Sequence, residues 1–404
     1  MRDTDLFQLA LGLVPPWLVK EAKFDVEKKR LDLEIDFTRG GLFPCSGCGK
    51  PDCPTHDTVT KTWRHLDFFQ HQAFLTARVA RSKCDGCGVR LVNVPWARPG
   101  SGFTLLFEAL AMTLVTAMPV AAAARIIKVH DTLLWRIVIH YVEKALAAAD
   151  LSKVTRIAVD ETAAKRGHNY ISLFVDVDQR RVLFVADGKD ASTVKAFADD
   201  LASHGGNAAN IAEVCIDMSA AFIKGVGDHL PKAEITFDKF HAVMLVNDAV
   251  DKVRRAEVKD RPELKKSRYL WLKNEPSLSA ESRVTLQALT RLHLRTGRAY
   301  QLKLAFQQIY QQPTRDWGKL FLHRWYDWAI RSRLEPMKDA ARTVKKHAEG
   351  ILRWFDSHIA NGLIEGINSL VQAAKAKARG YRTPRTLKAI TYLIAGKLDL
   401  RLPT

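Results

Sequence analysis

The sequence is short of cysteine and has no long uninterrupted apolar run. Six cysteines in 404 residues are too few for a disulfide-stabilised scaffold. The most apolar stretch, residues 105–127, is interrupted by Glu108, Pro119 and Arg125. It therefore predicts two helices of a water-soluble protein rather than a membrane span. The first residues have neither the basic segment nor the apolar core of a signal peptide. We therefore expect a cytoplasmic protein with no membrane partner.

Acidic residues are also in the minority. The 44 Asp and Glu stand against 62 Lys and Arg, which gives a formal net charge of +18. A surplus of this size is typical of folded proteins that bind a polyanion, either nucleic acid or an anionic membrane surface. Hydrophobic residues make up 47% of the chain, which excludes wholesale disorder. At roughly 100–200 residues per domain, the length predicts two to four domains.

Five of the six cysteines lie between positions 45 and 87, and four of them form two C-x₂-C-G motifs. Each motif can present two thiolates to a tetrahedral ion, and its glycine permits the tight turn behind them. The cysteines of the two motifs are Cys45, Cys48, Cys84 and Cys87. They predict a structural Zn²⁺ site. Cys53 and His56 also stand at ligand spacing, so a rival ligand set combines them with Cys45 and Cys48.

Residues 103–150 have a helical pattern in three segments. Phe103–Thr116 predicts one helix, Pro119 suits the start of a second, and Asp131 or its neighbour can cap a third. The expected core positions of the third helix are Leu134, Ile137, Val138 and Tyr141. Three short helices with a tight turn before the third describe a helix-turn-helix, although a plain three-helix linker is the alternative. The residues expected to contact DNA from the third helix and its turn are Lys128, His130, Thr132, Trp135 and Arg136.

Alternating and apolar patterns predict strands in two regions. The predicted N-terminal strands are residues 31–37 and 73–79. In the later region the predicted strands are residues 156–160, 170–176, 181–186, 213–217 and 234–237, with helices near 193–204 and 219–230. Three strands in meander order, followed by a helix, a strand and a helix, indicate a mixed α/β sheet. A long helical stretch then runs from about residue 240 to 350.

Two of these strands are predicted to end in aspartate, at Asp160 and Asp217. A third carboxylate, Glu365, shares one face of a predicted helix with Asn361 and Asn368. Two strand-end aspartates and a helical glutamate can bind two divalent ions about 3.5–4 Å apart, which activate an attacking oxygen and stabilise a leaving oxygen at phosphorus. Each carboxylate alone is weak evidence for such a site. Two strand-end aspartates followed by a glutamate on a late helix are a more specific indication of it.

Several short motifs accompany the cysteine pairs and the helix-turn-helix. They are Thr62–Leu66, Val159–Thr162, Lys165–Tyr170, Ile216–Ser219, Phe237–His241, Ile364–Asn368 and Ala378–Arg382. Through these motifs, the cysteine pairs and the helix-turn-helix, the chain resembles the DDE transposases of bacterial insertion sequences of the ISL-three family. The resemblance implies a multidomain α/β protein. Its catalytic part would be an RNase H-like core with a mixed sheet and a helical insertion, preceded by the zinc module and the helix-turn-helix.

This resemblance also implies an activity and a division of the chain. The protein would bind the terminal inverted repeats of its element, cut the ends and join them to target DNA with two Mg²⁺ ions, or Mn²⁺ in their place. It would act near the bacterial nucleoid, as at least a dimer on double-stranded DNA. The expected segments are 1–98 with the zinc module, 99–150 with the helix-turn-helix, 151–245 with the first part of the core, 246–350 with the insertion, and 351–404 with the last catalytic helix and a basic tail.

Carried over to this sequence, the metal-binding triad would be Asp160, Asp217 and Glu365. Some other DDE families place Tyr, Arg and Lys at −7, −4 and +7 from the glutamate, where this chain has His358, Asn361 and Gln372. Cations that hold the DNA would then come from elsewhere, and the candidates are Lys375, Lys377 and Arg379. Two histidines are further candidates for DNA contact, His168 and His241. Asp238 and His241 could instead bind a metal together, although a helix cap with a phosphate contact is favoured for this pair.

Two other functions fit parts of the pattern. A zinc-finger and helix-turn-helix regulator would use the same DNA-binding modules, with the three carboxylates serving only structure. An RNA-processing nuclease of RNase H type would need no sequence-specific DNA-binding module, whereas two such modules are predicted here. We therefore favour the transposase hypothesis.

Overall fold

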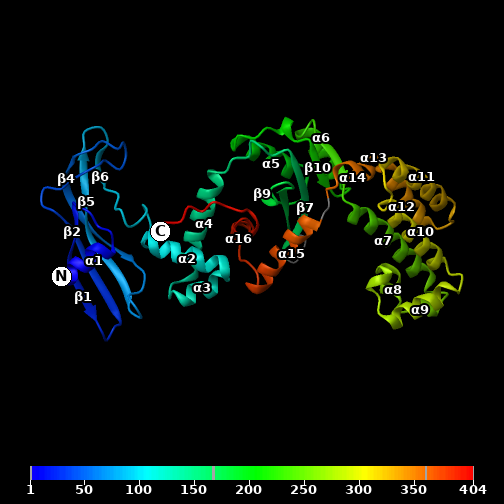
Figure 1. The fold of residues 1–404 in the computed structure, drawn as a ribbon, viewed down its shortest axis with the longest axis horizontal. Coiled ribbons are helices and arrows are strands. Elements are labelled where there is room, and N and C mark those ends of the chain that lie inside the picture. The colour runs from blue at the N-terminus through cyan, green and yellow to red at the C-terminus, as the bar shows by residue number, and fades with distance from the viewer. Residues whose placement is uncertain (1, 166–168, 360–361, 404) are drawn as a thin grey trace. The chain divides into compact units, whose positions relative to one another are not determined.

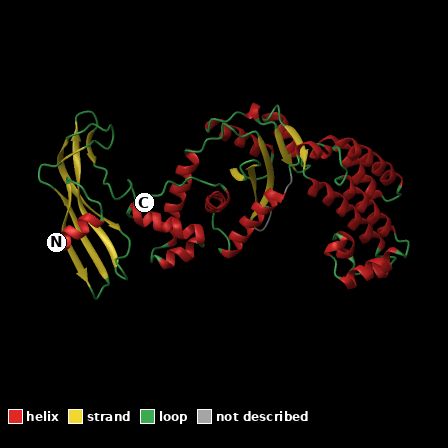
Figure 2. Ribbon diagram, viewed as in Figure 1, coloured by secondary structure: helices red, strands yellow, loops and turns green. Residues whose placement is uncertain are grey.

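The computed structural model describes residues 2–165, 169–359 and 362–403. The chain divides into two compact units, and their elements are labelled in Figure 1. One unit comprises Met1–Tyr141 with Asp399–Thr404, and the other comprises Val142–Leu398. Figure 2 shows that strands dominate the N-terminal part and helices the region after residue 239. No described helix is both long enough and apolar enough to span a membrane.

The first unit begins with helix α1 (Asp3–Ala10) and a six-stranded sheet. Its strands follow the order β1-β2-β5-β4-β3, and β6 pairs with β5. They are β1 (Trp17–Asp25), β2 (Arg30–Phe37), β3 (Leu42–Phe43), β4 (Cys53–Arg64), β5 (Gln72–Cys84) and β6 (Gly88–Leu91). Buried residues alternate with less buried ones along β2 and most of β5. This confirms the strands predicted at residues 31–37 and 73–79, which lie within β2 and β5.

Three helices follow the sheet, α2 (Leu105–Ala117), α3 (Val120–Ile126) and α4 (Asp131–Ala147). Thr104 caps α2 by accepting a hydrogen bond from the Phe107 N–H. The four core positions predicted for α4 are all buried. A buried carboxylate, Glu108, accepts hydrogen bonds from Arg98 Nε and from the Tyr141 hydroxyl, at 2.9 and 3.0 Å. This buried network ties the third helix to the first and fixes the geometry of the helix-turn-helix.

The second unit is built on a five-stranded sheet with the order β11-β10-β7-β8-β9. Its strands are β7 (Arg156–Lys165), β8 (Asn169–Asp176), β9 (Arg181–Asp187), β10 (Glu213–Ile216) and β11 (Glu234–Phe237). The first three form an antiparallel meander, and β10 and β11 run parallel to β7. This is the mixed sheet expected of an RNase H-like core. Helices α5 (Ala191–Ser203) and α6 (Ala220–His229) come before β10 and β11.

One strand differs from the sequence prediction. The segment predicted to end at Asp160 continues as β7 to Lys165, because it keeps pairing with β8 beyond the point where β10 has ended. Asp160 therefore lies within a strand. It still stands at the level where the neighbouring parallel strands stop.

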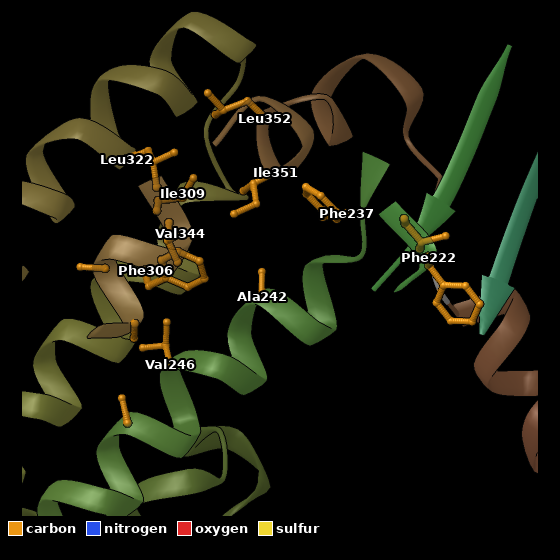
Figure 3. Packing of buried hydrophobic residues seen from close by; sticks show 14 of the residues in the cluster. Phe222, Phe237, Ala242, Val246, Phe306, Ile309, Leu322, Val344, Ile351 and Leu352 are labelled. Carbon is orange, nitrogen blue, oxygen red and sulfur yellow. The ribbon is translucent and has the colours of Figure 1, made fainter. Parts of the chain in front are cut away.

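The helical insertion begins directly after β11. Its α-helices are α7 (Lys239–Glu257), α8 (Arg268–Leu272), α9 (Ala280–Thr290), α10 (Arg295–Ile309), α11 (Arg315–Arg331), α12 (Glu335–Lys346), α13 (Ala348–Leu352) and α14 (Trp354–Ser357). Figure 3 shows Phe306, Leu322 and Val344 from three of these helices packed near Ala242 and Val246 of α7. Phe237 at the end of β11 belongs to the same hydrophobic cluster. The insertion thus shares its hydrophobic core with the five-stranded sheet.

The chain then returns to the sheet through α15 (Gly362–Lys377) and α16 (Pro384–Ala395). Tyr392 of α16 accepts a hydrogen bond from the Val185 N–H of β9 at 2.9 Å, and Lys388 pairs with Asp187 at 2.8 Å. Helix α15 lies beside β7 (Figure 1), and side chains of α15 bond to that strand.

Candidate active site and metal centres

Three adjacent parallel strands bring aspartates to one level of the sheet. Cys215 of β10 is paired with Ala158 of β7 on one side and Thr236 of β11 on the other. Two residues beyond these paired positions, each of the three segments has an aspartate: Asp160, Asp217 and Asp238. The two aspartates predicted as metal ligands therefore stand on neighbouring strands, with a third alongside.

The electrostatics of these groups are coupled. Burial raises the pKa of the Asp160 carboxyl, and the charges of Asp238 and Asp217 raise it further. His241 acts in the opposite direction and favours the ionised form of Asp160. Adjacent carboxylates that are partly shielded from water repel one another, so this end of the sheet favours a bound cation.

Asp238 is almost fully buried and caps helix α7. Its carboxylate accepts hydrogen bonds from the N–H groups of Phe240 and His241, at 3.1 and 3.2 Å. The His241 Nδ1 atom lies 2.9 Å from Asp238 Oδ2, and this interaction raises the pKa of the imidazole. The predicted helix cap is therefore confirmed. A contact of His241 with DNA phosphate stays a prediction.

Helix α15 brings Glu365 to the same region. Asn368, one turn further along the helix, donates a hydrogen bond from Nδ2 to Asp160 Oδ2 at 2.7 Å. Glu365 itself is exposed. Residues three apart on a helix share a face, so the face that carries Glu365 is the one that meets Asp160.

The carboxylates of Asp160, Asp217 and Glu365 do not form a close ligand group among the described residues. Among the described residues, only the four cysteines of the N-terminal module form a group of three or more potential ligands with donor atoms within 4.8 Å of one another. The donor set near Asp160 nevertheless fits a hard divalent cation, because it consists of carboxylate and amide oxygens. One of these oxygens, Oδ1 of Asn368, is buried and has no hydrogen-bond partner among the described residues.

The lysines and the arginine predicted to hold DNA after the glutamate fall into two groups, and Gln372, which stands where some other DDE families have Lys, shares the surroundings of the first. Gln372 and Lys375 bond to β7: Gln372 Nε2 donates to Thr162 Oγ1 at 2.7 Å, and Lys375 Nζ donates to the Ala163 carbonyl at 2.5 Å. Lys377 and Arg379 are exposed. His168 and Asn361 lie outside the described residues.

The four cysteines converge as the sequence predicts. The Sγ atoms of Cys45, Cys48, Cys84 and Cys87 lie within 4.8 Å of one another. Backbone N–H groups of Cys48 and Gly47 lower the pKa of Cys45 to about 6, and those of Gly86 and Cys87 lower the pKa of Cys84. The glycines behind both motifs adopt positive φ angles of 75° and 73°. Thiolates stabilised in two such turns fit a tetrahedral Zn²⁺ ion.

The rival ligand set is not assembled in the described structure. Cys53 is buried beside the cluster, whereas the side chain of His56 is half exposed and lies 3.4 Å from Asp57. Burial, together with the neighbouring Cys84, raises the pKa of the Cys53 thiol. Cys53 thus packs against the cysteine cluster as a neutral side chain.

Residues predicted to contact DNA surround the turn before α4. Lys128, with a positive φ of 54°, and His130 are exposed in this turn. His130 Nδ1 accepts a hydrogen bond from the Thr132 N–H at 3.3 Å, so it is the neighbour of Asp131 that caps the helix. Thr132 and Arg136 are exposed on α4, and Trp135 is half-buried.

Sequence reasoning missed some functional features of these sites. The bond between Asn368 and Asp160 was signalled only by the shared helical face of Glu365 and Asn368. The hydrogen bonds of the buried Glu108 could not be predicted, because the sequence shows only one charged residue inside an apolar stretch. The exposure of Trp317 and Trp328 on α11 was not predicted either, although their spacing places them on one helix face.

Comparison with known protein families agrees with this architecture. Residues 157–391 match the model of the DDE transposase domain of family ISL3, described as a transposase. The chain belongs to the ISL3 transposase family. Residues 92–142 match the helix-turn-helix domain of transposase family ISL3, and residues 42–87 match the zinc-finger of the transposases IS204/IS1001/IS1096/IS1165. The expected ISL-three resemblance is thereby confirmed.

Individual relatives extend over most of the chain. It is 27% identical to the transposase for insertion sequence element IS1557 of Mycobacterium tuberculosis, over 97% of this chain and 96% of the relative. It is 30% identical to the transposase for insertion sequence element IS1001 of Bordetella parapertussis, over 84% of this chain and 85% of the relative. This member of the ISL3 family is therefore a DNA transposase, an enzyme that cuts and transfers DNA.

Proposed function

We propose that this transposase recognises the terminal inverted repeats of its insertion sequence, hydrolyses the phosphodiester at each end, and joins the freed 3′-OH to target DNA. The observation that carries the proposal is the 2.7 Å hydrogen bond from Asn368 to Asp160, because it sets the helix bearing Glu365 against the strand bearing Asp160. Asp217 follows the neighbouring parallel strand. The three carboxylates thus come from elements that are already in contact.

Asp160, Asp217 and Glu365 would hold two Mg²⁺ or Mn²⁺ ions, whose chemistry is to activate the attacking oxygen and stabilise the leaving oxygen at phosphorus. Asn368 orients the Asp160 carboxylate. His241, held by Asp238, contributes positive charge near a bound phosphate, and the exposed Lys377 and Arg379 contact the DNA backbone. No covalent protein–DNA intermediate is needed, so no nucleophilic side chain is required.

The N-terminal modules supply recognition. Four cysteines would hold a structural Zn²⁺ ion, and the exposed residues of α4 and its turn would enter the major groove of the repeat. An insertion sequence has two ends that are joined to one target. We therefore expect at least a dimer on DNA.

An Asp217→Ala variant tests the catalytic assignment. With Mg²⁺ and repeat-containing DNA, the variant should lose strand cleavage and joining, and it should bind the repeat as well as or better than the wild type because a negative charge near the phosphate is removed. The exposed Asp228 of α6 offers a matched control, and Asp228→Ala should keep full activity. Cleavage by Asp217→Ala at the wild-type rate would refute the assignment. A wild-type protein that binds the repeat but never cuts it would favour the regulator hypothesis.

A further inference from the structure

Helix α11 in the insertion carries an exposed row of aromatic and basic side chains. The row, here called the tryptophan stripe, consists of Trp317, Leu320, Arg324, Trp328 and Arg331. Successive members are three or four residues apart, which places them along one face of the helix. Of the nine tryptophans of the chain, all of which the structure describes, Trp317 and Trp328 are the exposed ones, at 54% and 48%.

Folding of the insertion does not require this stripe. The opposite face of α11 supplies the core contacts, through Gly318, Leu322, Trp325 and Ala329. The buried Trp325 donates its indole N–H to the Leu302 carbonyl at 2.8 Å. Two large aromatic surfaces left in water on one helix are typical of a binding site rather than of packing.

The charges of the helix indicate the chemistry of the ligand. The ion pairs of α11 are made by Arg315, at its start, and by His323 with Asp327. Within the described part of the chain, Arg324 and Arg331 pair with no carboxylate. Tryptophan and arginine also occur together at protein–protein interfaces. In a chain of net charge +18, one arginine between the two aromatic faces and another just beyond them, neither paired with a carboxylate among the described residues, favour nucleic acid, since bases stack on the rings and phosphates pair with the guanidinium groups.

The ligand must present base faces, which the interior of a DNA duplex does not. Interior bases are covered on both sides by their neighbours, so away from the duplex end a tryptophan can stack only on a base that has left the helix. Trp317 and Trp328 are eleven residues apart, or about 16 Å along the helix axis. The stripe is therefore long enough to hold a segment of several unpaired nucleotides.

The start of the stripe is held by the last two helices of the insertion, α13 and α14, which lead back to the sheet. The Arg315 guanidinium bonds to Glu349 and Asp356, at 2.6 Å each. Gly318 allows Phe355 to pack directly on the helix, because a Cβ atom there would lie 2.4 Å from the Phe355 ring. Close to these contacts, Arg156 at the start of β7 donates to the Ser357 carbonyl at 2.8 Å. The segment that supports Trp317 is thus tied to the strand that carries Asp160.

We propose that the tryptophan stripe binds nucleotides that leave the duplex at the cut end of the element, and so holds single-stranded DNA at a fixed place relative to the catalytic carboxylates. This inference rests on the proposed function, which brings a DNA end to the insertion. The indole rings of Trp317 and Trp328 would stack on bases, Arg324 would bind a phosphate between them, and Arg331 a phosphate next to Trp328.

Binding of frayed DNA by the full-length protein tests the proposal. The probes are a blunt duplex and the same duplex with a four-nucleotide unpaired tip containing 2-aminopurine, both without divalent metal. Wild-type protein should bind the frayed end more tightly and quench the probe by stacking. Trp317→Ala and Trp328→Ala should each weaken frayed-end binding by about 5- to 150-fold, which corresponds to ~1–3 kcal/mol per stacked base. Blunt-end binding should change by less than about twofold.

Three controls separate base stacking from a general loss of aromatic surface or of stability. Trp317→Phe should retain most of the binding because it keeps an aromatic face. Tyr269, which is 63% exposed on α8 of the same insertion, supplies the control, and Tyr269→Ala should leave frayed-end binding unchanged. Because the stripe is exposed, thermal unfolding midpoints should stay within a few degrees of the wild type.

The possible outcomes keep the two proposals apart. Frayed-end binding that survives in the Trp317→Ala/Trp328→Ala double variant would overturn the stripe proposal. A change of oligomeric state in the double variant, with DNA binding intact, would overturn it in favour of a protein interface. Wild-type protein that cleaves repeat ends but shows no preference for frayed DNA would refute the stripe alone. Trp-dependent binding of frayed ends without any cleavage would refute the proposed catalysis and support the stripe.

Discussion

The side-chain amide of Asn368 donates a hydrogen bond to the carboxylate of Asp160 across 208 positions of sequence, with 2.7 Å between Nδ2 and Oδ2. This bond joins helix α15, which carries Glu365, to β7, the first strand of the five-stranded sheet, although the whole helical insertion lies between them in the sequence. It fixes one oxygen of Asp160 and leaves the other to accept the Glu161 N–H at 2.8 Å. The Asp160 carboxylate is therefore held in position from two directions.

Asn368→Ala should lower DNA cleavage by about 10- to 100-fold, the usual effect of removing a group that orients a metal-binding side chain. Repeat binding should be unchanged because Asn368 faces the protein. Ser369, exposed on the next position of α15, gives the control, and Ser369→Ala should cleave normally. Rates are best measured over a range of Mg²⁺ concentrations, since weakened metal binding would shift the concentration needed for half-maximal cleavage. Equal loss of cleavage in both variants would contradict the orienting role.

Much of the catalytic sheet could be predicted from sequence, because its strands are short apolar runs with distinct ends. The strands around Asp217 and Asp238 follow this rule closely. The end of β7 could not be predicted, since its extension to Lys165 depends on pairing with β8 and not on its own apolar content. Likewise, the spacing around Glu365 showed which side chains share a helix face, but only tertiary packing places that face against Asp160.

Zinc binding should depend on Cys84 and not on Cys53, although both thiols are buried. Cys84→Ser should abolish zinc binding and destabilise the N-terminal module, because a tetrahedral site would lose one of its four thiolates. Cys53→Ser should leave the zinc content unchanged and destabilise the module by about 1–3 kcal/mol through a buried hydroxyl. Zinc per chain can be measured by atomic emission, and stability by urea unfolding. Loss of zinc from both variants would favour the rival set with Cys53 and His56.

If α4 reads the terminal repeat, DNA binding should depend on Arg136, which is exposed on this helix. Arg136→Ala should weaken binding to the terminal repeat by about 1–3 kcal/mol if the guanidinium reads a base, with a smaller effect on random DNA. Lys144 lies exposed near the end of the same helix, and Lys144→Ala serves as the control. Fluorescence anisotropy with repeat and scrambled duplexes at fixed salt gives both affinities. An equal loss on both duplexes would instead assign Arg136 to the phosphate backbone.

The pair formed by His241 and Asp238 predicts a specific dependence of stability on pH. The Asp238 carboxylate, whose Oδ2 lies 2.9 Å from Nδ1, raises the pKa of His241 above its ordinary value of 6.5, and the nearby Asp160 and Asp217 charges act in the same direction. A histidine whose pKa is higher in the folded state stabilises the fold fully below its unfolded pKa and loses that contribution as the pH rises through the folded pKa. The free energy of unfolding of metal-free wild-type protein should therefore fall more steeply above pH 6.5 than that of His241→Gln.

Histidine NMR titration measures the same shift directly and identifies its cause. The His241 ring should titrate above pH 6.5 in the wild type, and Asp238→Asn, which keeps a capping oxygen, should lower its pKa towards or below the ordinary value. His323→Gln provides the control, because His323 faces solvent 3.4 Å from Asp327 and an exposed pair contributes little to stability. Its pH profile of unfolding should match that of the wild type. A His241 ring that titrates at its ordinary value in the wild type would show that Asp238 serves only as the cap of α7, and the positive charge assigned to His241 near the bound phosphate would then be wrong.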